Sequence, residues 1–356
     1  MLTSIERIPG AVASAPARAI VRAIADRPVL LALDGSNLAE RAIPVAAEIA
    51  RRRDTTLLIC RAVSDTTRQE MFGFLLETAV DERTATAAYV SRVAAETRSA
   101  WPGVRVETAV PSGPAAAALT ATVRDTNAQL TVLTTHGRSA AARMLRGSVT
   151  EEIVRASEGA TLVLWPWVLD RMTSPDWSAD VLIPPPSPGI GKRILVPLDG
   201  SPRTARVLPE AYRMAREVDG ELLLLTVVDL HRYRRARGEL IEHAVLDALD
   251  QRAAVVRAFG VRARAVTAVL ADPAAAIVEV AEREDCDTIA MTTHARGAVG
   301  RFIFGSVANH VAARAQRPIL FTPPLADPMG HGLALMYPDV PVPVLALAKF
   351  SQGRAA

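Results

Sequence analysis

A stretch rich in glycine, serine and arginine is the part of this sequence best suited to hold a phosphate group. It begins at Gly137 and ends at Gly147-Ser148, directly before a helical pattern. Glycine lets backbone N–H groups approach phosphate oxygens closely, and a helix start adds unpaired donors and a positive dipole end. The Ser148 hydroxyl can donate to the same oxygens. Three arginines flank the loop and supply positive charge: Arg138, Arg143 and Arg146.

A second stretch of the same kind ends at Gly305-Ser306, 158 residues after Gly147. Among the positions at which it departs from the first, Ala295 stands where the first stretch has Gly137. The extra Cβ restricts the backbone and hinders close approach to a phosphate. We therefore expect the second stretch to form the weaker site.

An aspartate in an Asp-Gly-Ser turn follows the first apolar run of each of these regions. Asp34 follows residues 29–33, and Asp199 follows residues 194–198. A carboxylate in this place either contacts a ligand or caps the helix that follows, and the residue types do not separate the two roles. Both interpretations stay open.

The sequence contains two copies of one pattern, which is the signature of a tandem repeat. The Asp34 turn returns at Asp199, 165 residues later, and Pro44 returns at Pro209 with the same spacing. The glycine–serine motifs are only 158 residues apart, so the second copy is seven residues shorter. The difference falls in its middle helical region.

The two copies are separated and flanked by segments of other composition. We call residues 26–167 repeat one and residues 191–324 repeat two. Residues 168–190 contain five prolines and predict a semi-rigid spacer. Residues 1–25 form an N-terminal extension, and residues 325–356 form a C-terminal tail.

Within each repeat, apolar runs of strand length alternate with helical patterns five times. In repeat one the runs are residues 29–33, 56–59, 104–110, 130–133 and 161–164. Residues 38–50 predict the first helix, capped by Ser36 or Asn37. Continuous apolar runs that alternate with helices are typical of buried parallel strands. We predict an α/β protein with two tandem Rossmann-like domains, each a five-stranded parallel sheet with helices on both faces.

In combination, the Asp-Gly-Ser turn, the Thr-His-Gly-Arg segment ending at Arg138 and the Gly-Ser-Val helix start resemble the universal stress protein family. The resemblance covers both repeats. It implies an adenine nucleotide alpha hydrolase-like fold with strand order 3-2-1-4-5, whose switch point lies between strands one and four. Nucleotide-binding members carry Gly-x-x-Gly-x9-Gly-Ser/Thr and an aspartate after the first strand.

The resemblance assigns nucleotide contacts in both repeats. In repeat one these are Asp34 for the adenosine, Ala62 beside the adenine, and Gly137, Gly147 and Ser148 for the phosphates. In repeat two the counterparts are Asp199, Val227, Gly305 and Ser306. The first motif glycine is replaced by Thr134 in repeat one and by Thr292 in repeat two. Repeat one is thus an incomplete site, and repeat two a weaker one.

These residues predict a non-enzymatic stress-response protein that binds ATP or another adenine nucleotide in repeat one, with a degenerate repeat two. Domains of the family pair through their last strands, so the resemblance implies an internal pseudo-dimer joined by residues 161–164 and 319–322. A further homodimer of whole chains stays open, as does slow ATP hydrolysis. The alternative is a nucleotide-free interaction or scaffold module that acts through the same pairing.

Composition excludes several other classes of protein. A net charge of +3 over 356 residues, without a long basic run, argues against a nucleic-acid partner. No apolar stretch reaches the ~20 residues of a membrane span, and no signal peptide pattern begins the chain. Cys60 and Cys286 form no metal-binding pair, and the chain has no known catalytic motif. We expect a cytoplasmic protein without a metal site or catalytic residues.

Overall fold

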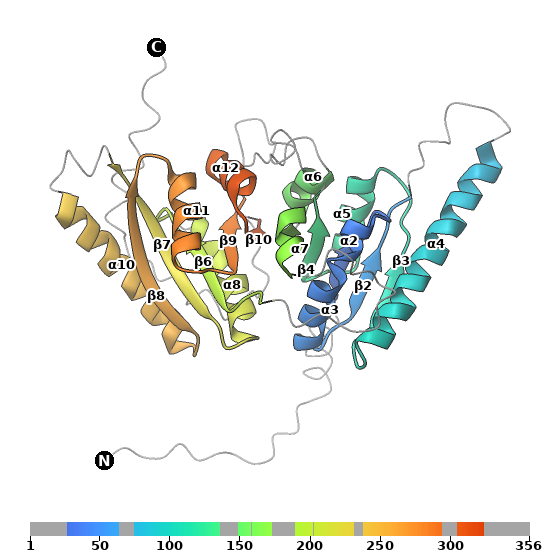
Figure 1. Cartoon of the computed structure of the whole chain (residues 1–356), viewed down its shortest axis with the longest axis horizontal. Helices are drawn as coiled ribbons and strands as arrows, with labels where there is room; N and C mark the ends of the chain where they lie inside the picture. The colour runs from blue at the N-terminus through green and yellow to red at the C-terminus, as the bar shows by residue number, and fades with distance from the viewer. Residues whose placement is uncertain are drawn as a thin grey trace, which may run out of the picture.

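The computed structural model describes residues 27–63, 75–135, 149–157, 159–172, 189–201, 203–230, 238–293 and 305–323. Ten strands of this part form one sheet in the order β3-β2-β1-β4-β5-β10-β9-β6-β7-β8 (Figure 1). The strands of repeat one are β1 (Val29–Ala32), β2 (Leu57–Cys60), β3 (Val106–Ala109), β4 (Leu130–Thr134) and β5 (Ala160–Leu164). Those of repeat two are β6 (Arg193–Pro197), β7 (Glu221–Asp229), β8 (Arg262–Leu270), β9 (Thr288–Thr292) and β10 (Ile319–Thr322).

Helices connect the strands in both repeats. Repeat one and the segment after it contain α2 (Asn37–Glu40), α3 (Ile43–Arg52), α4 (Leu75–Ala100), α5 (Ala115–Asp125), α6 (Val149–Ala156) and α7 (Pro166–Met172). Repeat two contains the 3₁₀ turn η2 (Thr204–Val207) and the helices α8 (Leu208–Arg216), α10 (Gly238–Ala258), α11 (Pro273–Arg283) and α12 (Ser306–Arg314). No helix among these residues combines the length and the hydrophobicity needed to cross a membrane.

The predicted fold class is confirmed, because the strands within each repeat are all parallel. In repeat one β1 lies between β2 and β4, and in repeat two β6 lies between β7 and β9. All four residues of β2 are buried, as a continuous apolar strand requires when helices cover both of its faces. The order 3-2-1-4-5 therefore holds in both repeats.

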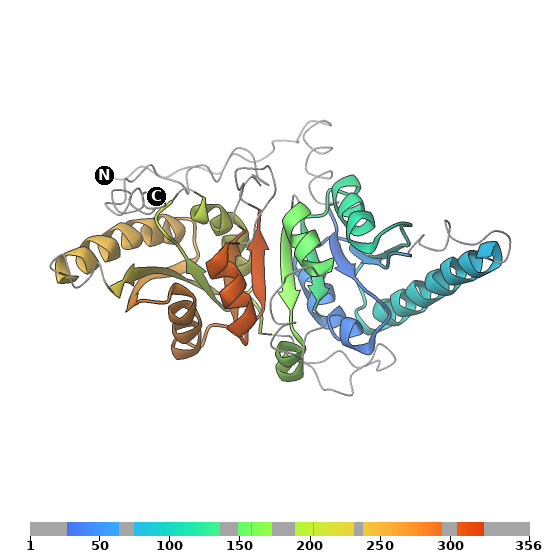
Figure 2. The same ribbon diagram turned by 90° about the horizontal axis from the view of Figure 1, so that it is seen from above.

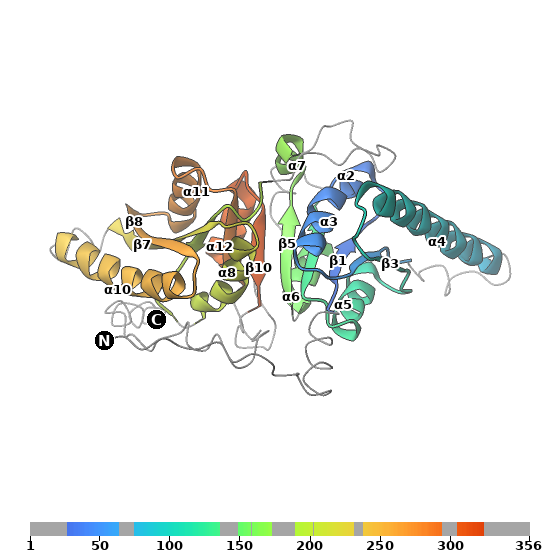
Figure 3. The same cartoon turned by 90° about the horizontal axis from the view of Figure 1, so that it is seen from below.

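Helices cover both faces of each five-stranded sheet. In repeat one α3 packs on β1 and β2, α4 packs on β2 and β3, and α5 contacts α6. Figure 3 shows α3 and α4 on one side of these strands and α5 on the other. In repeat two α10 and α11 both contact β7 and β8, from opposite sides. The apolar core is therefore sandwiched between sheet and helices in both repeats.

The two repeats meet at their last strands. β5 and β10 pair antiparallel, with Ile319 opposite Val163 and Phe321 opposite Thr161. Figure 2 shows these two strands side by side at the centre of the molecule. Each would be a sheet edge in an isolated repeat, with a row of unpaired backbone donors and acceptors. Their pairing turns two sheets into one.

The first helix of each repeat differs from the prediction. The pattern over residues 38–50 forms two helices, α2 and α3, separated by a turn. Pro44 explains the break, since its ring nitrogen has no hydrogen to donate to the carbonyl of Glu40, four residues earlier. Pro209 stands at the same place in α8, after η2. The capping prediction is confirmed for Ser36, whose side chain accepts a hydrogen bond from Ala39 N.

The helix α7 begins the segment between the repeats. It occupies residues 166–172, where the sequence predicted a proline-rich spacer from residue 168 onward. Trp167 Nε1 donates a hydrogen bond to Ala315 O of repeat two at 3.1 Å, and its ring stacks on that of Trp165. The start of this segment therefore packs into the junction of the two repeats.

Candidate functional site

The switch point of repeat one lies where the chain leaves β1 and β4. These strands are direct parallel neighbours, with Leu31 opposite Val132. The chain continues from β1 towards β2 and from β4 towards β5, on opposite sides, which leaves a crevice at the shared edge. Asp34 and Thr135 leave the sheet at this edge. The predicted phosphate residues Gly137, Gly147 and Ser148 follow Thr135 but lie outside the described residues.

The Asp34 turn is held by the aspartate itself. Ser36 N donates a hydrogen bond to Asp34 Oδ1 at 2.8 Å, and Gly35 between them has a φ of +90°. Side chains other than glycine rarely adopt this φ, so the turn requires Gly35. The turn-holding role of Asp34 is thus observed, and the turn lies on the exposed edge of the sheet.

Arg61 lies over this turn, and the sequence analysis missed it. It follows β2 directly, and a Cβ added to Gly35 would lie 2.7 Å from Arg61 Nη1. Its guanidinium stacks on the ring of Tyr89, 5.0 Å from the centroid, and forms no ion pair within the described residues. A cation directly before the predicted contact Ala62 was the signal that could have found it.

The ring of Tyr89, on α4, lies beneath two arginines, Arg61 and Arg92. Burial and the carboxylate of Glu40 raise the pKa of the Tyr89 phenol above its usual value, so the ring stays neutral. Arg92 lies over the same ring at 5.6 Å, but it is paired with Glu40 at 3.3 Å and with Glu96 at 2.8 Å. Arg61 is therefore the cation of this group that can meet an anionic ligand.

The neighbours of Arg61 along the chain are small. Ala62 is half-buried and packs on the apolar core, beyond the end of β2. Cys60 is fully buried, and burial raises the pKa of its thiol to about 12. The thiol therefore stays protonated and is a poor nucleophile.

The Asp199 turn of repeat two is tied more tightly. Asp199 Oδ1 accepts one hydrogen bond from Ser201 N and a second from Thr204 Oγ1, both at 2.8 Å. Repeat one has Ala39 at the position of Thr204, so the second bond has no counterpart there. The carboxylate of Asp199 thus serves its own loop.

The strands beside this turn are also longer in repeat two. β7 and β8 each have nine residues, whereas β2 and β3 each have four. Val227 consequently lies inside β7, opposite Ala268, while its counterpart Ala62 lies past a strand end. Thr226 takes the place of Arg61, and its hydroxyl donates to Leu198 O at 2.8 Å. Repeat two therefore has no cation at this position.

The helix start of repeat two is present where the sequence predicted it. Gly305 is the N-cap of α12, with a φ of −59° and a ψ of 144°, and Ser306 is the first helical residue. Other residues adopt these angles readily, so the backbone conformation alone does not require Gly305. The first N–H groups of α12 point out of the helix start, where an anion would be stabilised.

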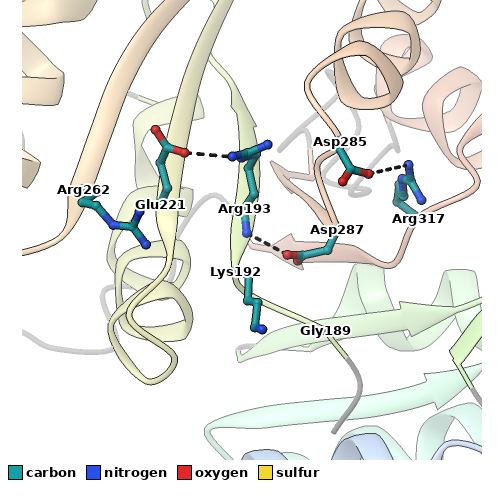
Figure 4. Close-up of a pocket in the computed structure, with 8 residues that line it drawn as sticks. All are labelled: Gly189, Lys192, Arg193, Glu221, Arg262, Asp285, Asp287 and Arg317. Atoms are coloured by element: carbon teal, nitrogen blue, oxygen red, sulfur yellow. Dashed lines mark hydrogen bonds and ion pairs between the residues drawn. The ribbon is translucent and has the colours of Figure 1, made fainter. Parts of the chain in front are cut away.

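A cavity of about 420 Å³ lies at the opposite edge of repeat two, at the amino ends of its strands (Figure 4). Several of its charged groups are engaged in ion pairs or in hydrogen bonds with the backbone. Arg193 Nε lies 3.3 Å from Glu221 Oε2, and Asp287 accepts a hydrogen bond from Arg193 N at 2.7 Å. Arg262 Nη2 donates to Asp219 O at 2.6 Å. These contacts hold the strand ends together.

Repeat one thus belongs to the class of doubly wound α/β domains whose ligand crevice lies at the carboxyl ends of parallel strands. Across the described residues, no three His, Cys, Asp or Glu side chains gather as a metal site would require. The described part of the candidate site is the strand edge with the Asp34 turn and Arg61.

Comparison with known proteins identifies the family. The profile of the universal stress protein family matches residues 27–164 and again residues 191–323. The chain belongs to this family, with two repeats of its domain in tandem.

Individual relatives agree with this result. A universal stress protein of Methanocaldococcus jannaschii is 32% identical over 138 residues, which are 36% of this chain and 80% of that protein. A universal stress protein structure from Archaeoglobus fulgidus superposes with a TM-score of 0.63 and 18% identity, covering 84% of this chain and 99% of the other. A protein of unknown function from Pseudomonas aeruginosa gives 0.55 and 15%, covering 85% and 94%. At these identities the two structures establish the fold alone.

Proposed function

We propose that this universal stress protein binds an adenine nucleotide in repeat one, and that this nucleotide is ATP. The observation that carries the proposal is the direct parallel pairing of β1 with β4. It brings the Asp34 turn and Thr135, which precedes the Gly137–Ser148 segment in the sequence, to one edge of the sheet. Those two segments are the ones that the family resemblance assigns to adenosine and phosphate.

The contrast between the repeats supports the choice of repeat one. Arg61 offers a positive charge at its edge, whereas Thr226 of repeat two is bonded to the backbone. Asp199 holds two bonds within its own loop. We propose that repeat two is degenerate as a nucleotide site, and that Arg61 attracts the anionic part of the ligand in repeat one.

Pairing of the repeats completes the proposal. The β5–β10 pairing supports an internal pseudo-dimer in which repeat two serves as the permanent partner of repeat one. We assign the protein a non-enzymatic role in the stress response, in which the bound nucleotide changes its stability or its partners. Cys60 and Cys286 are buried free thiols, which suits the reducing cytoplasm.

One observation favours a second function. Asp34 and Asp199 both act as acceptors for their own turns, which is a sufficient reason for an aspartate at these positions. Together with the replaced glycines, this supports a nucleotide-free scaffold that acts through its paired repeats.

The nucleotide content of the purified protein decides between the two functions. The chain is purified, denatured, and any released nucleotide is identified by chromatography and mass. We expect about one ATP per chain, lost in Gly147→Val and kept in the matched variant Gly305→Val of repeat two. Circular dichroism confirms that both variants fold.

Absence of nucleotide from the wild-type chain, with no binding of added ATP by calorimetry, would establish the scaffold instead. Loss of ATP in Gly305→Val alone would place the site in repeat two. Incubation with labelled ATP tests the non-enzymatic role, and we expect no turnover above the buffer rate.

A further inference from the structure

A cluster of charged side chains is buried between the two repeats, away from the ligand edge. Arg53, directly after α3 of repeat one, reaches into α8 of repeat two. Its Nη2 lies 2.8 Å from Glu210 Oε1 and its Nε lies 2.8 Å from Glu217 Oε1. Arg213 of α8 contacts the other Glu210 oxygen at 2.5 Å and donates to Gln129 Oε1 of repeat one, also at 2.5 Å.

The cluster is closed to solvent at its centre. The side chains of Arg53 and Glu210 are 3% and 2% exposed. Burial opposes ionisation of Glu210, but Arg53 and Arg213 outweigh it and hold the pKa of Glu210 below its usual value. Burial raises the pKa of Glu217, which is hydrogen-bonded by Arg53 alone and is repelled by Glu210. Both glutamates of repeat two therefore depend on Arg53 of repeat one.

The repeat spacing of 165 residues shows that this cluster is not symmetric. Four positions on α3 and α8 carry different residues in the two repeats, and at two of them the charge is reversed. The pairs are Val45 and Glu210, Glu48 and Arg213, Arg52 and Glu217, and Arg53 and Val218. The equivalence is secure because Asp54 and Asp219, directly after these positions, both have a positive φ, of 47° and 50°.

The other half of the junction is consistent with this asymmetry. There Arg52 contacts its own helix and the segment between the repeats. It pairs with Glu48 of its own helix at 2.8 Å and donates to Ile190 O at 3.5 Å. The junction thus has one half with a buried ion cluster between repeats and another half with a local pair.

We propose that these four positions make the junction selective, so that repeat one binds repeat two and neither repeat binds a copy of itself. The inference rests on the internal pairing of the proposed function and is independent of nucleotide binding. Backbone pairing of β5 with β10 carries no such preference, because any last strand offers the same donors and acceptors.

The equivalent positions show which unfavourable contacts a complex of two identical repeats would have. In a pair of two repeat-one domains, Arg53 would face Val45 and Arg52 in place of the two glutamates. In a pair of two repeat-two domains, Glu210 and Glu217 would face Val218 and lose their shared cation. An unpaired buried charge and a like-charge contact are both strongly unfavourable. The partner that fits each face is therefore the other repeat.

The test uses the whole chain with a protease site inserted between residues 172 and 189. After cleavage, both halves are separated in urea and returned to buffer together. Native mass spectrometry then measures the amount of each kind of pair. We expect pairs of repeat one with repeat two in at least ~10-fold excess over pairs of two identical repeats. Equal amounts of like and unlike pairs would overturn the selectivity while leaving the pairing itself intact. If the two halves do not associate at all, both the selectivity and the pairing are overturned.

Exchange variants identify the residues responsible. The first variant gives repeat two the face of repeat one: Glu210→Val, Arg213→Glu, Glu217→Arg and Val218→Arg. The second adds the reverse exchange in repeat one: Val45→Glu, Glu48→Arg, Arg52→Glu and Arg53→Val. We expect the excess of unlike pairs to vanish in the first variant and to return in the second, where the faces again complement each other.

A matched control exchanges two opposite charges at a place away from the junction. Exchange of the exposed pair Arg257 and Asp250 on α10, as Arg257→Asp with Asp250→Arg, leaves the preference unchanged. Failure of the second exchange variant to regain the preference, in a chain that still shows native circular dichroism, would overturn the assignment to these four positions. The ATP content of the uncleaved wild type is measured separately, so a missing nucleotide does not affect this result.

Discussion

Repeat one and repeat two have the same strands in the same order, yet they differ at the edge where the first strand ends. In repeat one, Arg61 stacks on Tyr89 above the Asp34 turn, next to short strands. In repeat two, Thr226 is bonded to the backbone and lies within a nine-residue strand. The difference teaches that the same sheet core accommodates different residues at this edge, because the core does not depend on them.

The helices at the junction differ in another way. α3 and α8 have ten and nine residues and share a proline at the same place, while the charges on their contacting faces are complementary. The proposed ligand edge lies before the helices that follow the first strands, and the contacts between the repeats lie at the far ends of these helices. Each can therefore be broken without the other, which the predictions below exploit.

The largest effect is expected for Arg53→Met, which breaks the junction alone. The variant leaves Glu210 and Glu217 buried without their shared cation, and removal of one partner from a buried pair costs about 3–5 kcal/mol. We expect the melting temperature to fall by roughly 10 °C in calorimetry. The control Arg257→Met, which breaks an exposed pair, should cost less than about 1 kcal/mol. Equal effects of the two variants would contradict the buried cluster.

The same variant makes stability depend on pH. Without Arg53, we expect the folded-state pKa of Glu210 to rise above its unfolded value, and that of Glu217, which burial already raises, to rise further. Stability is then lost as the pH rises from the unfolded pKa through the folded one. The difference in free energy of unfolding between wild type and Arg53→Met should therefore grow from about pH 5 to about pH 8. A difference that stays constant over this range would show that packing, and not charge, is lost.

An intermediate effect is expected at the two aspartate turns. Gly35 and Gly200 have φ values of +90° and +83°, so alanine at either position costs about 1–3 kcal/mol of stability. The two substitutions should differ in nucleotide binding. Gly35→Ala forces Arg61 away, because the new Cβ would lie 2.7 Å from its guanidinium, whereas Gly200→Ala changes repeat two only. Loss of ATP binding in Gly200→Ala would break the contrast between the edges.

The sequence was sufficient for the fold because the fold depends on patterns that span many residues. Five apolar runs in each repeat, alternating with helical patterns, predicted parallel strands, and the strand bounds agree to within a few residues. The break between α2 and α3 was missed, although Pro44 carries the signal. A single proline changes only one hydrogen bond in a helical pattern, so periodicity hides it.

The junction and the cation of the site were harder to predict. The contact between Arg53 and Glu210 joins residues 157 positions apart, and a sequence does not show which faces of two helices meet. Arg61 was overlooked because its importance comes from its place over Gly35, which only the packing of α4 against β2 establishes. Both features depend on tertiary contacts, which local patterns do not encode.

The smallest effect on stability is expected for Arg61→Met. This variant tests the difference between the two repeats at the proposed ligand edge. Within the described residues Arg61 has no ion pair to lose, and methionine keeps an apolar contact with Tyr89. We expect a change in free energy of unfolding below about 1 kcal/mol. ATP affinity should fall about 10-fold, because a charge-assisted contact with the ligand is removed.

The matched variant is Thr226→Val at the same position of repeat two, which should leave ATP affinity unchanged. Titration calorimetry at two salt concentrations separates the causes, since a lost charge also weakens the salt dependence of binding. If Arg61→Met binds ATP as the wild type does, the guanidinium is part of the Tyr89 packing alone. The choice of repeat one would then depend on the Asp34 turn and on the glycine–serine loop.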